Sequence, residues 1–78
     1  MEISVRVRLD EILKERSMTQ KELVELIKEK LDKDVRTASI SELYNNQRKS
    51  LNKELIETIA SALEITNIDE FITFDIKK

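Results

Sequence analysis

The sequence predicts a mostly α-helical domain that carries a small antiparallel β-ribbon formed by its N- and C-terminal segments. Apolar residues recur at helical spacing through the middle of the chain, while a short segment at each end alternates apolar and polar residues. The 78 residues include neither glycine nor proline, so helix boundaries must be read from capping residues. We expect residues 1–78 to form one domain around a single core.

The two terminal segments are the expected strands. Residues 3–9 alternate four apolar with three polar side chains, which is typical of a half-buried strand, and residues 71–76 are also β-prone. The apolar positions are Ile3, Val5, Val7 and Leu9 in the first segment and Ile72, Phe74 and Ile76 in the second. We expect the two to pair antiparallel and to rest on helices, because an isolated two-stranded ribbon is marginal. The alternative is that one of them pairs with a second subunit.

The first half of the chain predicts two helices. A short one covers residues 9–16. The next begins at Thr19, which stands three residues before Glu22 as in a capping box, while Met18 and Leu23 form the matching hydrophobic staple. Its inward stripe contains Leu23, Leu26, Ile27 and Leu31, and residues 32–34 end it with a polar turn.

Three further helices are expected. One spans 36–45, capped by Arg36 or Thr37 and anchored by Ile40, Leu43 and Tyr44. Another starts near Asn52 and faces inward with Leu55, Ile56, Ile59, Ala60 and Leu63. The last runs from about Thr66, which with Asp69 resembles a capping box, into Phe71. Since there is no glycine, we expect asparagine to occupy positions of positive φ, the candidates being Asn45, Asn46, Asn52 and Asn67.

The composition argues against an enzyme. The chain has no histidine and no cysteine, which removes the usual general base, the thiol nucleophile and most metal ligands. We therefore expect no catalytic residues, no metal, no cofactor and no small-molecule substrate. No apolar run is long enough to span a membrane and the N-terminus lacks the features of a secretory signal, so a cytoplasmic location is expected.

The charge of the chain is unevenly distributed. The net charge is −2, from 14 basic and 16 acidic residues. Between residues 36 and 53 the balance is instead +3, because Glu42 is the only acidic residue among four basic ones, Arg36, Arg48, Lys49 and Lys53. One face is therefore expected to be positive within an acidic protein.

Residues 35–49 carry the strongest functional signal. Their thin apolar back can anchor a helix to the core, and the small side chains Thr37, Ala38, Ser39 and Ser41 let that helix enter a groove. Arg48 and Lys49 follow where a phosphate backbone would pass. The segment therefore favours a DNA-reading helix.

Two ordered blocks carry a family resemblance. Thr19-Gln20-Lys21-Glu22-Leu23, followed later by Ile40-Ser41-Glu42-Leu43-Tyr44-Asn45, resembles the lambda-repressor/Cro-like helix-turn-helix family, also called XRE. Residues 55–63 resemble the packing helix that follows in that family. The resemblance implies a lambda-repressor-like five-helix domain that binds double-stranded DNA.

The sequence departs from the family pattern in three places. Val24 stands for the usual alanine, and Asn46 replaces the glycine after the recognition helix. Residues 27–34 replace a compact glycine turn, so either the scaffolding helix is longer or the turn is a true loop. The angle between the two helices depends on which of these occurs.

The resemblance also implies roles for individual residues. Gln20 would bind a phosphate, or be merely solvated. Four residues match positions that face the major groove, namely Arg36, Thr37, Ala38 and Glu42; an exposed glutamate can equally be an ordinary surface residue. Ser39 and Ser41 either contact DNA or only keep the helix narrow. The expected phosphate contacts are Asn45, Gln47, Arg48 and Lys49, although the last two can also be a solvated charge pair.

These observations predict a sequence-specific DNA-binding transcriptional regulator, a small repressor that reads the major groove with helix 36–45. One such helix reaches only a few base pairs, so a homodimer on two half-sites is expected. Its contacts would lie in the terminal strands or the last helix. The alternative is a protein-interaction module on the same fold, of antirepressor or antitoxin type, that does not bind DNA; the acidic total, Glu42 and the long turn support it.

Overall fold

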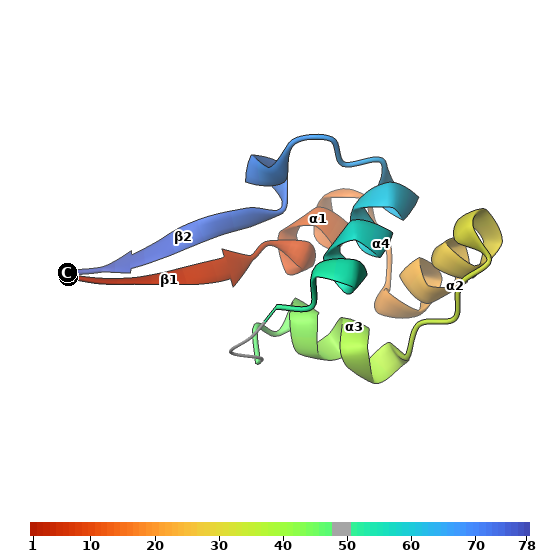
Figure 1. Ribbon diagram of the computed structural model, residues 1–78, viewed down its shortest axis with the longest axis horizontal. Helices are drawn as coiled ribbons and strands as arrows, with labels where there is room; N and C mark the ends of the chain where they lie inside the picture. The colour runs from red at the N-terminus through yellow and green to blue at the C-terminus, as the bar shows by residue number, and fades with distance from the viewer. Residues whose placement is uncertain (48–50) are drawn as a thin grey trace.

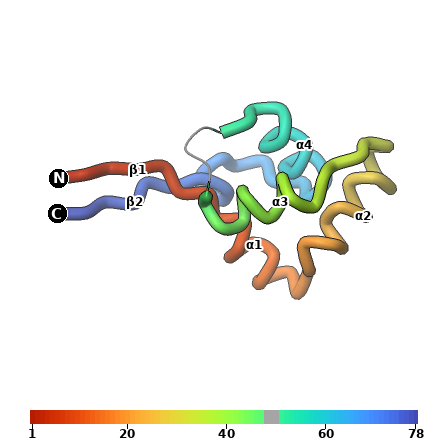
Figure 2. The backbone as a smooth tube through the Cα atoms, turned by 90° about the horizontal axis from the view of Figure 1, so that it is seen from below, coloured from red at the N-terminus to blue at the C-terminus, as the bar shows by residue number. Residues whose placement is uncertain are grey.

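The structure, a computed structural model, describes residues 1–47 and 51–78. A two-stranded ribbon projects from a body of helices, and both chain ends lie at the ribbon tip (Figures 1 and 2). In chain order the elements are β1 (Glu2–Val7), α1 (Leu9–Glu15), α2 (Gln20–Leu31), α3 (Thr37–Tyr44), α4 (Lys53–Leu63), the 3-10 helix η1 (Ile68–Glu70) and β2 (Ile72–Lys77).

The predicted antiparallel pairing of the terminal segments is confirmed. β1 pairs with β2 of the same chain, with Val5 opposite Phe74 at the middle of the ribbon. The strand is shorter than expected, because Leu9 belongs to α1 and not to β1. Pairing stops at Arg8, whose N–H donates to the Phe71 carbonyl at 2.7 Å while its own carbonyl accepts the first helical bond of α1.

The capping box at the start of α2 is present as predicted. The Glu22 N–H donates to Thr19 Oγ1 at 3.1 Å, and the Thr19 N–H donates to Glu22 Oε1 at 2.9 Å. These two bonds satisfy helix N-terminal donors that otherwise have no partner within the helix. The pKa of Glu22 is lowered, because hydrogen bonds from the Thr19 backbone and, to a lesser extent, from the Thr19 side chain favour the charged carboxylate.

One core joins the four α-helices to the base of the ribbon. The predicted anchors Leu23, Ile27, Ile40, Leu43, Ile59 and Leu63 are buried in it. The other buried apolar residues are Val7, Leu9, Ile12, Leu13, Ala62 and Phe71. Six further residues that were predicted to face inward are partly buried against this core, namely Leu26, Leu31, Tyr44, Leu55, Ile56 and Ala60. The helical pattern therefore identified the residues around the core as well.

The expectation that asparagine would fill the positions of positive φ is wrong for three of the four candidates. Of the four asparagines, only Asn46 has a positive φ. The other described residues with a positive φ are Ser17, Asp32 and Glu64. Asp32 and Glu64 are the left-handed C-caps of α2 and α4, where glycine is usual. Asn52 and Asn67 instead serve as N-caps, and Asn45 ends α3 with a negative φ.

The helix expected from Thr66 to Phe71 is only the three-residue helix η1. The described residues therefore hold four α-helices and one 3-10 turn. Its cap is Asn67, not Thr66, since Asn67 Oδ1 accepts from the Asp69 N–H at 3.0 Å. The turn cannot extend, because Phe71 is drawn into the core and Ile72 already pairs with Val7.

Asn46 joins the end of α3 to the base of the ribbon. Its left-handed backbone, with φ at 53°, directs the side chain toward β1. There Oδ1 accepts from the Val7 N–H at 2.8 Å, and Nδ2 donates to the Val7 carbonyl at 3.0 Å. The amide thus satisfies both backbone groups of Val7 on the edge of β1 that β2 does not cover. We call this pair of bonds the Asn46 bridge.

The capping box predicts a pH-dependent loss of stability. Glu22→Gln should destabilise the protein at pH 7, because it removes the carboxylate that the bonds from Thr19 favour. The folded pKa of Glu22 is below the ordinary value of 4.5, so its stabilisation is present above pH 4.5 and lost as the pH falls through the folded pKa. Urea unfolding across this range should show the difference from wild type shrinking in acid. Glu25→Gln, on the exposed side of the same helix, is the control, and an equal pH trend for both would contradict the assignment.

The Asn46 bridge predicts an ordered series of stabilities. Asn46→Gly keeps a backbone suited to positive φ but loses both bonds, so the free energy of unfolding should fall by about 1–2 kcal/mol. Asn46→Ala also loses the bonds but, unlike the glycine variant, keeps a Cβ in the left-handed region, which costs about 1 kcal/mol more than glycine does there. Chemical denaturation measures both. A glycine variant as stable as wild type would show that the bridge contributes nothing.

Candidate nucleic-acid interface

Helices α2 and α3 form a helix-turn-helix with a long connection. α2 extends to Leu31, and residues 32–36 then connect it to α3, so both sequence alternatives, a longer helix and a true loop, occur together. Lys28 holds the connection with ion pairs to Asp32 at 3.2 Å and Asp34 at 3.6 Å. Val35 packs partly buried against the core. The extra residues are therefore fixed at both ends of the turn.

The orientation of α3 follows from its two faces. Ile40 and Leu43 are buried, whereas Thr37 and Ala38 are exposed on the outer side. In Figure 1, α3 runs along the lower side of the helical body, with the start of α2 above it; Figure 2 views the body from that side. α3 therefore exposes Thr37 and Ala38, two of the four small side chains of the predicted face.

Arg36 stands at the entrance to α3. Its extended backbone forms the N-cap and its carbonyl accepts from the N–H groups of Ser39 and Ile40, but its side chain makes no capping bond. The guanidinium is exposed, and no ion pair joins it to another residue of the described ranges. Arg36, Thr37 and Ala38 thus lie together at the exposed N-terminal end of the helix.

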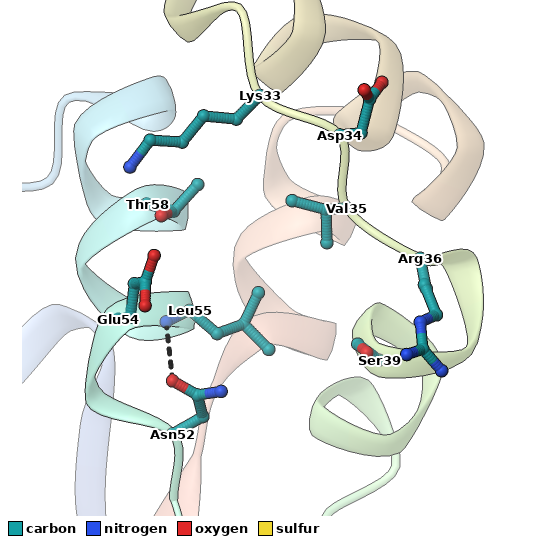
Figure 3. A pocket seen from close by; sticks show the side chains of 9 residues that line it. All are labelled: Lys33, Asp34, Val35, Arg36, Ser39, Asn52, Glu54, Leu55 and Thr58. Carbon is teal, nitrogen blue, oxygen red and sulfur yellow. Dashed lines mark hydrogen bonds between the residues drawn. The ribbon is translucent and has the colours of Figure 1, made fainter.

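The remaining predicted residues of α3 are less accessible. Ser39, Ser41 and Glu42 are half-buried. Ser39 borders a hollow of about 450 Å³ between the turn, α3 and α4 (Figure 3), whereas Glu42 lines a second hollow beside β1. The two residues therefore lie at the flanks of the helix and not on its outermost line.

The side chain of Asn45 forms hydrogen bonds within its own helix. Its Nδ2 donates to the Ser41 carbonyl at 3.0 Å and lies 3.3 Å from Ser41 Oγ. Gln47 is exposed, and its N–H donates to the Glu42 carbonyl at 3.0 Å. Arg48 and Lys49 lie outside the described residues. Gln20 is the first residue of α2 and half-buried.

The hollow beside α3 has a cation that the sequence analysis did not single out. Lys33, in the turn, lines it together with Arg36 (Figure 3). Asp34 and Glu54 line the same hollow, so charges of both signs surround it. The sequence marked Lys33 only as part of a polar turn, because no local pattern says that its side chain extends over the hollow toward Thr58 of α4 (Figure 3).

Two other cations are already paired at the base of the ribbon. Arg8 Nε lies 2.6 Å from a Glu11 carboxylate oxygen, and Arg6 lies 2.8 Å from Asp10. The hydrogen bond from Arg8 is the main cause of the lowered pKa of Glu11. These arginines therefore add little net positive charge beside α3.

Two further features are absent from the described ranges. Residues 1–47 and 51–78 contain no group of three or more acidic, histidine or cysteine side chains placed to hold a metal ion. In the same ranges, no helix has the length and apolar character needed to cross a membrane.

Comparison with known proteins agrees with this arrangement. The family model of the Cro/C1-type HTH DNA-binding domain matches residues 8–77. Neither a curated protein nor a solved structure matches the chain. The family match spans nearly all of the sequence and both helices of the helix-turn-helix, and it confirms the resemblance seen in the two sequence blocks. The chain therefore belongs to the Cro/C1-type helix-turn-helix DNA-binding domain family.

Proposed function

We propose that this chain is a sequence-specific transcriptional regulator, a small repressor that reads the DNA major groove with α3. The observation that carries the proposal is the slim outer face of α3, where Thr37 and Ala38 are exposed while Ile40 and Leu43 hold the helix to the core. A helix of about 10–12 Å diameter fits the major groove, and small side chains bring its backbone close to the base edges. We take residues 1–78 as one DNA-binding unit.

The N-terminal end of α3 is the proposed base-reading region. Arg36 has an exposed guanidinium that suits the two acceptors of a guanine, and the Ala38 methyl suits the methyl group of a thymine. Thr37 lies beside them. Glu42 lies further along the helix and is half-buried, which places it at the edge of the proposed contact. There its carboxylate would accept a hydrogen bond from a cytosine amino group.

Phosphate contacts are proposed on both sides of α3. Gln20, at the start of α2, would bind one strand, and Asn45, Gln47, Arg48 and Lys49 the other. Ser39 and Ser41 would keep the helix narrow and add contacts only at its flanks. The cations Arg48 and Lys49 are the main electrostatic contribution in this proposal, because Arg6 and Arg8 are already paired with carboxylates.

We also propose that the regulator acts as a homodimer on a two-fold symmetric site. An eight-residue recognition helix is about 12 Å long and covers only a few base pairs. Two copies on half-sites one helical turn apart double the sequence that is read.

A protein-interaction module on the same fold is the second candidate. It is favoured by the net charge of −2 and by Glu42 on the flank of α3, because a carboxylate near the groove is repelled by phosphates. In such a module, α3 would contact a protein surface and Arg36 would pair with a carboxylate of the partner.

Selection of bound duplexes from a random pool separates the two candidates. The regulator should enrich a palindromic site whose half-sites are about 10 base pairs apart, centre to centre. Binding to that site should fall steeply with salt, because counterions are released from the phosphates. Failure to retain any duplex even at low salt would contradict DNA binding and favour the interaction module.

Substitutions should divide the proposed contacts into two kinds. Arg36→Ala should relax the preference at one position of each half-site, whereas Arg48→Ala with Lys49→Ala should weaken binding to all sequences alike. The double variant should also flatten the slope of log K against log salt by about 2, at roughly 0.9 per phosphate contact. Fluorescence anisotropy titrations at several salt concentrations measure both effects.

A double variant at the ribbon tip is the matched control. Lys77→Ala with Lys78→Ala removes the same charge at the end of the ribbon away from the helical body (Figure 1). It should leave the salt slope within error of wild type. Equal flattening by the two double variants would mean that only the total charge matters, and would remove Arg48 and Lys49 from the interface.

A further inference from the structure

The hollow between the turn, α3 and α4 contains a buried hydroxyl group without a partner. Thr58 lines it and is 6% exposed, which makes it the one buried polar residue of the described ranges, 1–47 and 51–78. No hydrogen bond joins its hydroxyl to another residue of those ranges, whereas the Ser61 hydroxyl of the same helix donates to the Glu57 carbonyl at 2.8 Å. A buried hydroxyl without a partner is unfavourable, so it indicates a position where a ligand can accept a hydrogen bond.

The Thr58 hydroxyl is accessible from the hollow. Among the described residues, Asp10 Oδ1 is the one side-chain atom that is both sealed from solvent and unpaired. The Thr58 hydroxyl is unpaired as well, so it is not sealed, and the hollow is the space that this residue lines. A small molecule in the hollow can therefore reach it.

The middle of the hollow is apolar. Val35 from the turn and Leu55 from α4 point toward each other across it (Figure 3), and both are half-buried against the core. The volume of about 450 Å³ is within the roughly 300–1,000 Å³ of small-molecule sites, which combine an apolar lining with a few polar groups. The hollow therefore has the size and the composition of a ligand site.

Two opposite charges lie on the α4 side of the hollow. Lys33, from the turn, extends over it toward Thr58, and Glu54 lies about one helical turn before Thr58 on the same side (Figure 3). Both charged side chains are exposed, and within the described part of the chain no ion pair joins either of them to another residue. The Thr58 hydroxyl thus lies between an ammonium group and a carboxylate.

A third charge faces them from the start of α3. Arg36 lines the opposite side of the hollow together with Ser39 (Figure 3). Asp34 also borders the hollow, but its carboxylate points away from it and lies 3.6 Å from Lys28. The charged groups that face the hollow are thus two cations and one carboxylate, with a single positive charge in excess.

We propose that this hollow binds a small acidic amino acid, a molecule with two carboxylates and one ammonium group. Its α-carboxylate would accept from the Thr58 hydroxyl and pair with Lys33, while its ammonium group pairs with Glu54. Its side-chain carboxylate would then reach Arg36 on the other side, and its methylene groups would cover the apolar middle. The single net negative charge of the ligand offsets the excess positive charge of the hollow.

Binding of the amino acid would regulate DNA binding through Arg36, a step that rests on the proposed function. Arg36 is the N-cap of α3 and the proposed reader of guanine. A guanidinium that holds the ligand carboxylate cannot at the same time form both of its bonds to a guanine. Amino acid and DNA should therefore oppose each other, and each should weaken the binding of the other by the same factor. The amino acid would thus act as an inducer that releases the regulator from its site.

A titration of the full chain with L-glutamate, followed by NMR, tests the site without DNA. At constant pH and ionic strength, the amide signals of Ser39, Leu55 and Thr58 should shift and saturate with a Kd of about 1–10 mM, because the ligand is small and the hollow is open. Glutarate lacks the ammonium group and norvaline lacks the side-chain carboxylate, so each should bind at least about fivefold more weakly.

Two results of this titration would overturn the proposal. Equal binding of glutamate, glutarate and norvaline would contradict the ligand class, because none of the three charged groups would then be recognised. An absence of saturable shifts at these amides up to about 50 mM glutamate would remove the site altogether.

Thr58→Val tests the hydroxyl at nearly constant side-chain volume. It should raise the Kd for glutamate about tenfold, while thermal unfolding should show equal or higher stability because the hydroxyl has no partner in the protein. Ser61→Ala removes a hydroxyl from the same helix outside the hollow, and should leave the Kd within about twofold. Equal Kd values for Thr58→Val and wild type would overturn the assignment, as would a clear loss of stability in Thr58→Val.

Competition with DNA tests the regulatory step. Glutamate at about five times its Kd should raise the apparent Kd for the selected duplex about sixfold in wild type. Thr58→Val in the same glutamate concentration is the control for general salt effects, and its DNA affinity should change by less than about twofold. If wild type binds glutamate and DNA independently, competition is overturned and the proposed function is intact. A chain that binds glutamate but no duplex would keep the site and overturn the proposed function.

Discussion

The position of α3 depends on a narrow apolar edge, because few of its side chains pack against the core. Of its eight residues only Ile40 and Leu43 are buried, and Tyr44 is the one other apolar residue that packs against the core. The other five are Thr37, Ala38, Ser39, Ser41 and Glu42, which are exposed or half-buried. A helix with so narrow an apolar edge is marginal by itself, and its position must also be fixed at its two ends. The turn does this at the start, through Val35, which packs partly buried against the core, and through the ion pairs of Lys28. The Asn46 bridge does it at the end. The narrow edge that exposes the helix thus requires the anchors on both sides of it.

The parts of the fold that sequence predicted are those with a local signal. The capping box at Thr19, the stripe of α2 and the alternating terminal segments each repeat at a spacing that one element dictates, and the structure has them all. The failures share a cause, which is competition between neighbouring elements. Leu9 completes the alternation of β1 but is needed in the core at the start of α1, and Thr66 loses its capping role to Asn67 because the chain must turn into β2. The Asn46 bridge spans 39 residues of sequence, so no local pattern marks it.

Charge explains how an acidic chain can carry a DNA-binding fold. Several of its charged side chains form local ion pairs: Arg8 with Glu11, Arg6 with Asp10, and Lys28 with the two aspartates of the turn. Such paired groups contribute little to the field at a distance, and salt screens what remains beyond about 10 Å. In the proposed complex, a phosphate backbone meets the local set of unpaired side chains beside α3. The exposed guanidinium of Arg36 therefore matters more than the total of −2.

The Asn46 bridge joins the end of α3 to the base of the ribbon. Asn46 follows the C-cap of the helix proposed to read DNA and also binds the backbone of Val7, where the ribbon enters the core. The direction of β1 and the position of the end of α3 are therefore linked, because Val7 is the last residue of β1. Asparagine suits this position for two reasons at once. It tolerates the left-handed backbone better than most residues, and its amide offers both the donor and the acceptor that a strand edge requires. Glycine, usual after a recognition helix of this family, would meet only the first requirement.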